Sequence, residues 1–167
     1  MRKSFLGTVA AALALAGCAS GGSGTATAGS QAPAPATSSA ALTTATTSLG
    51  TVVVDGKGRA VYSFDKDTPG APASACKGVC IGLWPEVTTT SSSPKVSGVT
   101  GTVGTAPTTG GRQQITLDGH RLYTFSGDTK AGQVNGQAFM NIWWVLTPAG
   151  QLVKSGAAAS SAPSITY

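Results

Sequence analysis

The most constraining feature of this sequence is an internal repeat built around two Asp-Gly turns. In each copy, a run containing β-branched residues leads into the turn, and a second run carries the pattern Tyr-x-Phe-x-x-Asp; the copies occupy residues 50–67 and 112–128. Asp-Gly between apolar runs favours a β-hairpin, because such turns need positive φ angles that glycine adopts at little steric cost. The repeat therefore predicts two tandem β-hairpins.

The remaining segments of the domain also favour strands. Further strands are expected at residues 99–105, 141–146 and 151–154. No window has the periodicity of an amphipathic helix. We expect an all-β, antiparallel fold in which tandem β-hairpin repeats form one small domain at residues 49–154. Repeat one spans about residues 49–87 and repeat two about residues 99–154.

The Tyr-x-Phe-x-x-Asp runs supply the candidate core and a candidate site. Their aromatic residues are Tyr62 and Phe64 in the first copy, and Tyr123 and Phe125 in the second. Alternation along a strand places each pair on one face, where we expect cross-strand packing. Asp67 and Asp128 are expected to stabilise the turns that follow, by accepting hydrogen bonds from backbone amides. The functional alternative is a metal or ligand site built from Asp65, Asp67 and Asp128.

The first 18 residues have the layout of a bacterial lipoprotein signal. Arg2 and Lys3 give a positive start, an apolar stretch follows, and residues 15–18 read Leu-Ala-Gly-Cys. The apolar stretch is shorter than the roughly 20 residues of a membrane-spanning helix. We expect cleavage after residue 17 and acylation of Cys18, with palmitate as an acyl group. Two acyl chains would anchor the protein stably. The alternatives are an ordinary signal peptide or an uncleaved membrane helix.

A low-complexity segment follows the predicted anchor. Residues 19–48 consist almost entirely of Ala, Gly, Ser, Thr, Pro and Gln and carry no charge, and residues 155–162 have a similar composition. Such segments bury too little apolar surface to offset the entropy lost on ordering. The sequence therefore predicts a disordered tether at residues 18–48 and a flexible tail at residues 155–167.

The charge distribution argues against nucleic acid as a partner. Without the signal, nine basic and six acidic residues remain, a net charge of +3. The basic residues are scattered and form no clustered stripe of the kind that nucleic-acid-binding domains carry. We expect a protein on the extracytoplasmic face of a bacterial cell membrane or outer membrane. Its expected partners are the membrane, through the lipid, and an envelope protein or wall polymer; no cofactor is expected.

Several motifs occur in an order that resembles a known family. They comprise Tyr62, Phe64, Asp67 and Trp84 in the first repeat, and Tyr123, Phe125, Asp128 and Trp144 in the second. A Cys-x-x-x-Cys segment lies between Asp67 and Trp84. With these motifs, the sequence resembles the bacterial lipoproteins that share a Tyr-x-(Phe/Trp/Tyr)-x-x-Asp motif, the secreted repeat of unknown function. The resemblance implies an exported, usually lipid-anchored tandem repeat. It implies no activity, because the family is known by its sequence pattern.

Two cysteines remain besides the predicted acylated one. In an exported domain, Cys76 and Cys80 favour a structural disulfide, and one helical turn between them would give a suitable Cα separation. The bond would fix the segment that leads to Trp84. The alternative is a periplasmic or surface protein that handles copper or redox chemistry. It would use both thiolates with His120 and Met140, since these ligand types suit copper, and it predicts that the four side chains converge.

No catalytic centre is visible in the sequence. One histidine would have to serve any triad, the acidic residues lie mostly at turns, and the glycine-rich stretches match no phosphate-binding loop. We therefore expect a non-catalytic binding or envelope-associated module of unknown ligand. Its binding surface should include an exposed apolar or aromatic patch, for example around Phe139 or Trp143.

Overall fold

The structure, a computed structural model, describes residues 40–108 and 111–154. Its strands are β1 (Leu42–Thr47), β2 (Gly50–Asp55), β3 (Tyr62–Phe64), β4 (Thr88–Thr89), β5 (Val103–Pro107), β6 (Gln113–Leu117), β7 (His120–Arg121) and β8 (Trp143–Val145). Two short helices interrupt them: α1 (Val79–Leu83) and the 3-10 helix η2 (Phe139–Asn141). All strand pairs are antiparallel, which confirms the predicted all-β fold. Within the described residues, neither helix has the length or apolar character that crossing a membrane requires.

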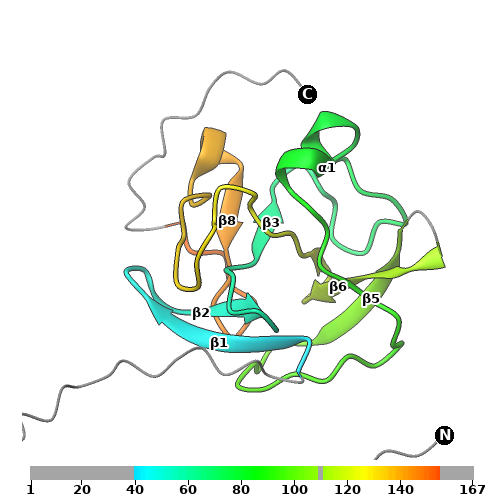
Figure 1. Ribbon diagram of the computed structural model, residues 1–167. Helices are drawn as coiled ribbons and strands as arrows, with labels where there is room; N and C mark the ends of the chain where they lie inside the picture. Colours follow the sequence, from blue (N-terminus) through cyan, green and yellow to red (C-terminus); the bar gives the residue numbers. More distant parts are fainter. Residues whose placement is uncertain (1–39, 109–110, 155–167) are drawn as a thin grey trace, which may run out of the picture. The chain divides into compact units, whose positions relative to one another are not determined.

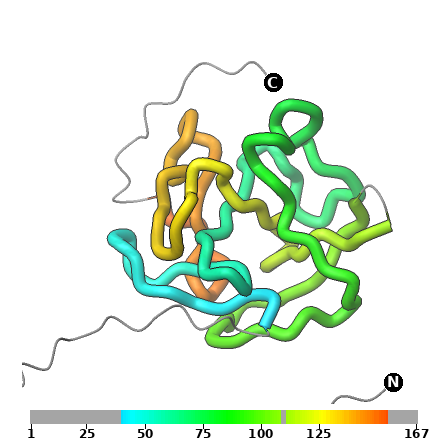
Figure 2. The backbone as a smooth tube through the Cα atoms, in the orientation of Figure 1, coloured from blue at the N-terminus to red at the C-terminus, as the bar shows by residue number. Residues whose placement is uncertain are grey.

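Each repeat contributes a strand pair followed by the motif run. β1 pairs with β2 in the first repeat, and β5 pairs with β6 in the second; β4 and β7 also pair with β6. Figure 1 shows β1 and β2 at the lower left of the domain and β5 and β6 at the right, with β8 and β3 above β2 in this view; Figure 2 shows the same path as a tube. The repeat unit is therefore two paired strands and a motif run, and it is longer than a single hairpin.

The strand β1 corrects the predicted boundary of the tether. Leu42–Thr47 falls within the disordered tether predicted at residues 18–48, but β1 pairs with β2 along its whole length. Leu42 is fully buried, and threonine, the commonest residue of β1, favours strands. The low-complexity composition concealed this strand because its apolar partners lie in β2. The rest of the predicted tether, with Cys18, and the tail at residues 155–167 lie outside the described residues.

The second Asp-Gly turn forms the predicted two-residue hairpin. Leu117 of β6 pairs directly with His120 of β7. Asp118 and Gly119 between them have φ angles of 50° and 82°. Positive φ at both central residues is the signature of a type I′ turn, whose twist matches that of the flanking strands.

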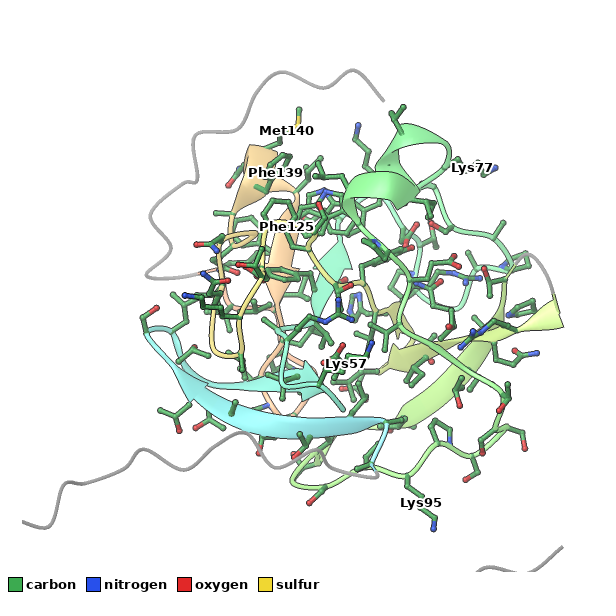
Figure 3. The ribbon with its side chains drawn as sticks, in the orientation of Figure 1. Lys57, Lys77, Lys95, Phe125, Phe139 and Met140 are labelled. Atoms are coloured by element: carbon green, nitrogen blue, oxygen red, sulfur yellow. A yellow bond between two sulfur atoms is a disulfide. The ribbon has the colours of Figure 1, made fainter. Side chains whose placement is uncertain are left out.

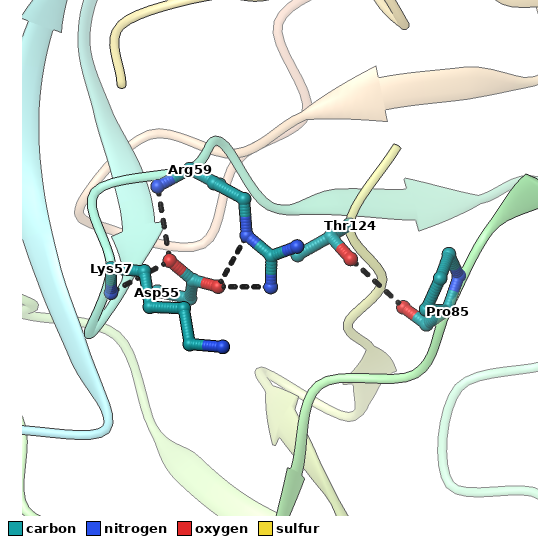
Figure 4. Close-up of polar contacts among 5 residues, drawn as sticks. All are labelled: Asp55, Lys57, Arg59, Pro85 and Thr124. Atoms are coloured by element: carbon teal, nitrogen blue, oxygen red, sulfur yellow. Dashed lines mark hydrogen bonds and ion pairs between the residues drawn. The ribbon is translucent and has the colours of Figure 1, made fainter. Parts of the chain in front are cut away.

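The first Asp-Gly turn differs from the expected hairpin turn. The backbone N–H of Asp55 donates to the carbonyl oxygen of Arg59, so the turn between them has three residues, 56–58. The positive φ of 79° falls on Gly58, two positions after the Asp-Gly glycine. Asp55 Oδ1 accepts hydrogen bonds from the backbone N–H groups of Lys57 (2.9 Å) and Arg59 (3.0 Å), as Figure 4 shows. The aspartate side chain thus adds to the backbone hydrogen bonds from Gly58 to Asp55 and from Asp55 to Arg59, which also close this wider turn.

The two repeats exchange strands at the centre of the domain. β3 of repeat one pairs with β8 of repeat two, and Tyr123 of repeat two forms a bridge with Glu86 of repeat one. The motif tyrosines of the two repeats, Tyr62 and Tyr123, form an antiparallel bridge with each other. The backbone N–H of Tyr62 donates to the carbonyl oxygen of Tyr123 at 2.8 Å, and the reverse bond is 3.0 Å. The tandem repeats therefore form one interleaved unit.

A column of four aromatic rings occupies the core between the repeats. Phe64 stacks on Trp143 with ring centroids 4.2 Å apart, and Trp143 stacks on Trp84 at 3.8 Å. The ring of Phe125 lies 4.5 Å from that of Trp84 and is tilted by 33° against it. Along the column, rings from repeat one (Phe64 and Trp84) alternate with rings from repeat two (Trp143 and Phe125). Gly136 lies against it, and a Cβ atom at that position would come within 2.7 Å of the Trp84 ring. The backbone can therefore approach the column only because position 136 has no side chain.

Candidate functional site

The motif tyrosines and aspartates form two crossed pairs. The Tyr62 hydroxyl donates a hydrogen bond to Asp128 Oδ2 at 2.6 Å, and the Tyr123 hydroxyl donates to Asp67 Oδ2 at 2.5 Å. Each tyrosine therefore binds the aspartate of the other repeat's motif. Hydrogen bonds of this type, with a carboxylate acceptor, are stronger than those between neutral groups.

The same aspartates also hold the loops that follow them. Asp67 Oδ1 accepts the backbone N–H of Ala75 at 2.6 Å, and Asp128 Oδ1 accepts that of Asn135 at 2.9 Å. The predicted bonding to backbone amides is present, but the amides lie eight and seven residues along the chain. Each aspartate therefore closes a long loop and also joins that loop to the other repeat.

Burial sets the protonation of these pairs. It raises the pKa of Tyr62 far above the ordinary tyrosine value, and the negative charge of Asp128 raises it further. Burial also raises the pKa of Tyr123, with a further increase from its hydrogen bond to Asp67. The pKa of Asp128 is raised by burial, and the hydrogen bond from Tyr62 partly opposes that change. Both hydroxyl groups consequently remain protonated donors through the physiological pH range.

The three aspartates proposed as one site have separate partners. Asp65 Oδ2 accepts a hydrogen bond from Trp144 Nε1 at 2.8 Å and lies 3.1 Å from Lys154 Nζ. Asp67 and Asp128 bind the two tyrosines. Within residues 40–108 and 111–154, no group of three or more histidine, cysteine, aspartate or glutamate side chains could hold a metal ion together.

The structural counterpart of Trp84 is Trp143. Phe64 pairs with Trp143 between β3 and β8. In the other repeat, the bridge between Glu86 and Tyr123 places Phe125 opposite Trp84 in the same way. The family resemblance names Trp144, the neighbour of Trp143, as the motif tryptophan of repeat two. Trp144 instead points to the other side of its strand and binds Asp65.

The expected aromatic binding patch is absent from its predicted place. Trp143 is 0% exposed because it lies within the aromatic column, and Phe139 is 4% exposed because it packs against Trp84 of that column. Among the described residues, the large apolar side chains at the surface are Val79, 72% exposed, and Met140, 40% exposed. Figure 3 shows Met140 at the edge of the domain, beyond Phe139 and Phe125.

The four candidate copper ligands do not form a common site. Cys76 and Cys80 are joined in a disulfide with a Cα–Cα separation of 5.3 Å, so they offer no free thiolate. His120 Nδ1 lies 3.2 Å from the Ser63 hydroxyl. Met140 lies on the surface at η2. The convergence that copper binding by these residues requires is not observed.

A hollow lies beside the disulfide. It is a pocket of about 590 Å³, lined among others by Pro72, Cys76, Lys77, Ile81, Glu86 and Arg121. This volume falls within the range of small-molecule sites, which are commonly apolar pockets with a few polar groups. The pocket joins the loop before α1, the disulfide and the end of β5, which are far apart in sequence.

The motif residues position one wall of this pocket. The Ser74 hydroxyl, on the pocket surface, lies 2.7 Å from the Tyr123 hydroxyl and accepts the backbone N–H of Cys76 at 2.8 Å. Asp67 binds the intervening amide of Ala75. The Tyr-x-Phe-x-x-Asp residues thus act on the pocket indirectly, by fixing the loop that forms its wall.

Arg121 is the main pocket residue that sequence reasoning missed. It is 3% exposed. Its Nη1 donates to Pro107 O (3.1 Å) and Gln114 Oε1 (2.8 Å), and its Nη2 donates to Ala71 O (3.0 Å). In the repeat alignment its counterpart is Ala60, because Tyr123 corresponds to Tyr62. The sequence offered one signal: repeat two has a charged residue at a position where repeat one has an alanine.

A second hollow of about 330 Å³ lies on the other side of Glu86. Its lining includes Asp55, Lys57, Arg59 and Arg112. Figure 4 shows that Arg59 turns toward Asp55, and the two side chains form hydrogen bonds of 3.0 and 2.7 Å. The Arg59 guanidinium is thus already bound to Asp55 and is not free to bind a ligand. The pocket beside the disulfide is therefore the stronger candidate site.

Removing the disulfide is expected to weaken the domain moderately. Replacing Cys76 and Cys80 with serine should lower the free energy of unfolding by about 2 kcal/mol, as the chain-entropy relation gives for so short a loop. Urea denaturation of the double variant measures this change, and the wild-type protein under reducing conditions is the matched comparison. A change below about 0.5 kcal/mol in both would contradict the stabilising role.

Comparison with known proteins identifies the repeat. A family model described as a secreted repeat of unknown function matches residues 43–88 and 104–147, together more than half of the chain. The matches begin one residue inside β1 and one residue inside β5, so each covers a strand pair and the motif that follows. No curated protein and no solved structure matches the chain.

Proposed function

This chain belongs to the family of secreted repeats of unknown function, and on that premise we propose that it is a lipid-anchored binding module without catalytic activity. The lipid is attached at Cys18 and keeps the domain at the extracytoplasmic face of a bacterial membrane. The ligand enters the pocket beside the disulfide.

The pocket is the observation that carries the binding role. The aromatic motif residues are buried in the shared core, and the motif tyrosines and aspartates bind one another across the repeats. These contacts leave a rigid domain, while the disulfide and the Asp67-bound loop frame a pocket of about 590 Å³. Pre-formed pockets of this kind bind ligands without the entropic cost of ordering loops.

The anchor is supported by the amino-terminal sequence. A basic start, a short apolar stretch and Leu-Ala-Gly before Cys18 follow the order of a lipoprotein signal. The family description agrees with export. An anchored domain stays near the cell surface, where its pocket samples molecules of the envelope or the surroundings.

Replacing Cys18 with serine is expected to release the protein from membranes. In bacteria that express the full chain, the wild-type protein should enter the detergent phase of a Triton X-114 extraction and incorporate labelled palmitate. The Cys18→Ser variant should do neither, because it lacks the thiol that carries the lipid. The Cys76→Ser/Cys80→Ser variant is the control and should behave like wild type. Full detergent partitioning of Cys18→Ser would refute the anchor.

A further inference from the structure

The pocket contains a buried positive charge without a counter-ion. Within the described residues, the ion pairs are Asp55–Arg59 and Asp65–Lys154, and neither includes Arg121. Its hydrogen-bond partners are two backbone carbonyls and a glutamine side chain, all neutral, and its Nε has no partner in that part of the chain. A buried charge is normally paired, because its desolvation is otherwise uncompensated.

The corresponding position of repeat one carries no charge. Ala60, the counterpart of Arg121 in repeat one, is fully buried among apolar residues. The matching strand position therefore accepts a small apolar side chain in the same interleaved architecture. Arg121 distinguishes repeat two from repeat one at the place where a pocket adjoins the strand.

The other lining residues indicate the rest of the ligand. Pro72, Ile81 and the disulfide present apolar surface. Lys77 adds a second positive charge, and Figure 3 shows it pointing outward beside α1. Glu86 contributes one negative charge, and its carboxylate accepts a hydrogen bond from the Thr108 hydroxyl. The pocket lining thus carries one net positive charge, and the Glu86 carboxylate repels a second negative charge placed near it.

We infer that the pocket binds a small organic carboxylate with an apolar body, whose anionic group lies nearest Arg121. This inference rests on the proposed binding function and names its ligand class. The carboxylate supplies the counter-charge that Arg121 lacks, and the apolar body covers Ile81 and the disulfide. Guanidinium groups suit carboxylates because both are planar and their geometries match.

The test uses two probes of the same shape and different charge. Hexanoate and hexanamide are titrated separately into the isotope-labelled mature protein, and amide chemical shifts are followed by NMR. The expected result is that hexanoate shifts the amides of Ser74, Lys77 and Ile81 and binds at least tenfold more tightly than hexanamide. Hexyl phosphate, a dianion near neutral pH, should bind more weakly than hexanoate because Glu86 opposes the second charge.

Variants separate the ionic contact from general surface charge. Arg121→Met should abolish the preference for hexanoate, whereas the control Lys95→Gln, a change at an exposed residue outside the pocket lining, should retain it. Should Arg121→Met fail to fold, the comparison of the two probes on wild type still decides. Equal affinity for hexanoate and hexanamide at the pocket would overturn the carboxylate inference and leave the binding function in place. No shift at pocket amides with either probe would overturn the inference and remove support for this pocket, while the Cys18 anchor would still be tested separately.

Discussion

Replacing Trp84 with alanine is expected to lower the free energy of unfolding by about 3–5 kcal/mol, the range for removing a large buried aromatic side chain. Trp84 is fully buried, stacks on Trp143, and also contacts Tyr62, Phe125 and Phe139. Its indole N–H has no hydrogen-bond partner in the described residues, so its contribution comes from burial and ring packing. Domains of this size have total stabilities of about 5–15 kcal/mol. Urea denaturation followed by circular dichroism should therefore show a much lower midpoint.

Two variants control for this result. Trp84→Phe keeps a ring in the column and should lose less stability. Val79→Ala changes an exposed residue of α1 and should alter the free energy of unfolding by at most about 0.5 kcal/mol. A loss below about 1 kcal/mol for Trp84→Ala would show that the column does not hold the two repeats together.

Removing the Tyr62 hydroxyl is expected to destabilise the domain by about 1.5–3 kcal/mol at neutral pH, the range for a hydrogen bond to a charged group. In Tyr62→Phe, the buried carboxylate of Asp128 loses its hydroxyl donor, and the backbone N–H of Gly136 loses its acceptor. Neither group can recruit bulk water easily at that depth. Urea denaturation at pH 7 measures the loss.

The size of this effect should depend on pH in a defined direction. Burial raises the pKa of Asp128, and the Tyr62 hydrogen bond partly opposes this rise. As pH falls through the raised value, Asp128 takes up a proton in the folded state before it does so in the unfolded state. The Asp128 contribution therefore favours folding below the ordinary value of about 3.9 and is lost as pH rises through the folded-state pKa.

Tyr62→Phe removes a bond that favours ionised Asp128, so its cost should be largest above the raised pKa and should shrink as pH falls through it. The matched variant is Tyr123→Phe. Its partner Asp67 is partly exposed, so water can replace part of the lost bond and the cost at pH 7 should be smaller. An equal cost of Tyr62→Phe above and below the titration of Asp128 would contradict the assigned charge state.

The features that depend on local sequence were predictable. The hairpin at Asp118-Gly119 follows from the backbone angles that its turn residues favour. The bond between Cys76 and Cys80 follows from short spacing in an exported chain. The strands that flank these motifs follow from β-branched and aromatic residues, although the strand expected at residues 99–105 lies at Val103–Pro107.

The features that depend on distant partners were not predictable. The pairing of β3 with β8 joins residues about eighty positions apart. The residue pattern of a strand does not indicate which other strand it pairs with. The choice between Trp143 and Trp144 required knowing which face of β8 lies toward Trp84. Arg121 was counted with the other scattered charges, although it occupies the position that Ala60 occupies in repeat one; only the fold showed that it is buried beside a pocket. The pocket formed from three separate segments and left no contiguous motif.

The central claim is that a tyrosine from one repeat and an aspartate from the other act as a pair that locks the repeats into one unit. A double-mutant cycle tests it directly, with Tyr62→Phe and Asp128→Ala measured singly and together by urea denaturation. The account predicts a coupling energy of at least about 1 kcal/mol, within the range for residues in direct contact. It predicts almost no coupling for Tyr62→Phe with Asp67→Ala, the pair within one motif. The reverse pattern, with coupling inside the motif and none between repeats, would contradict it.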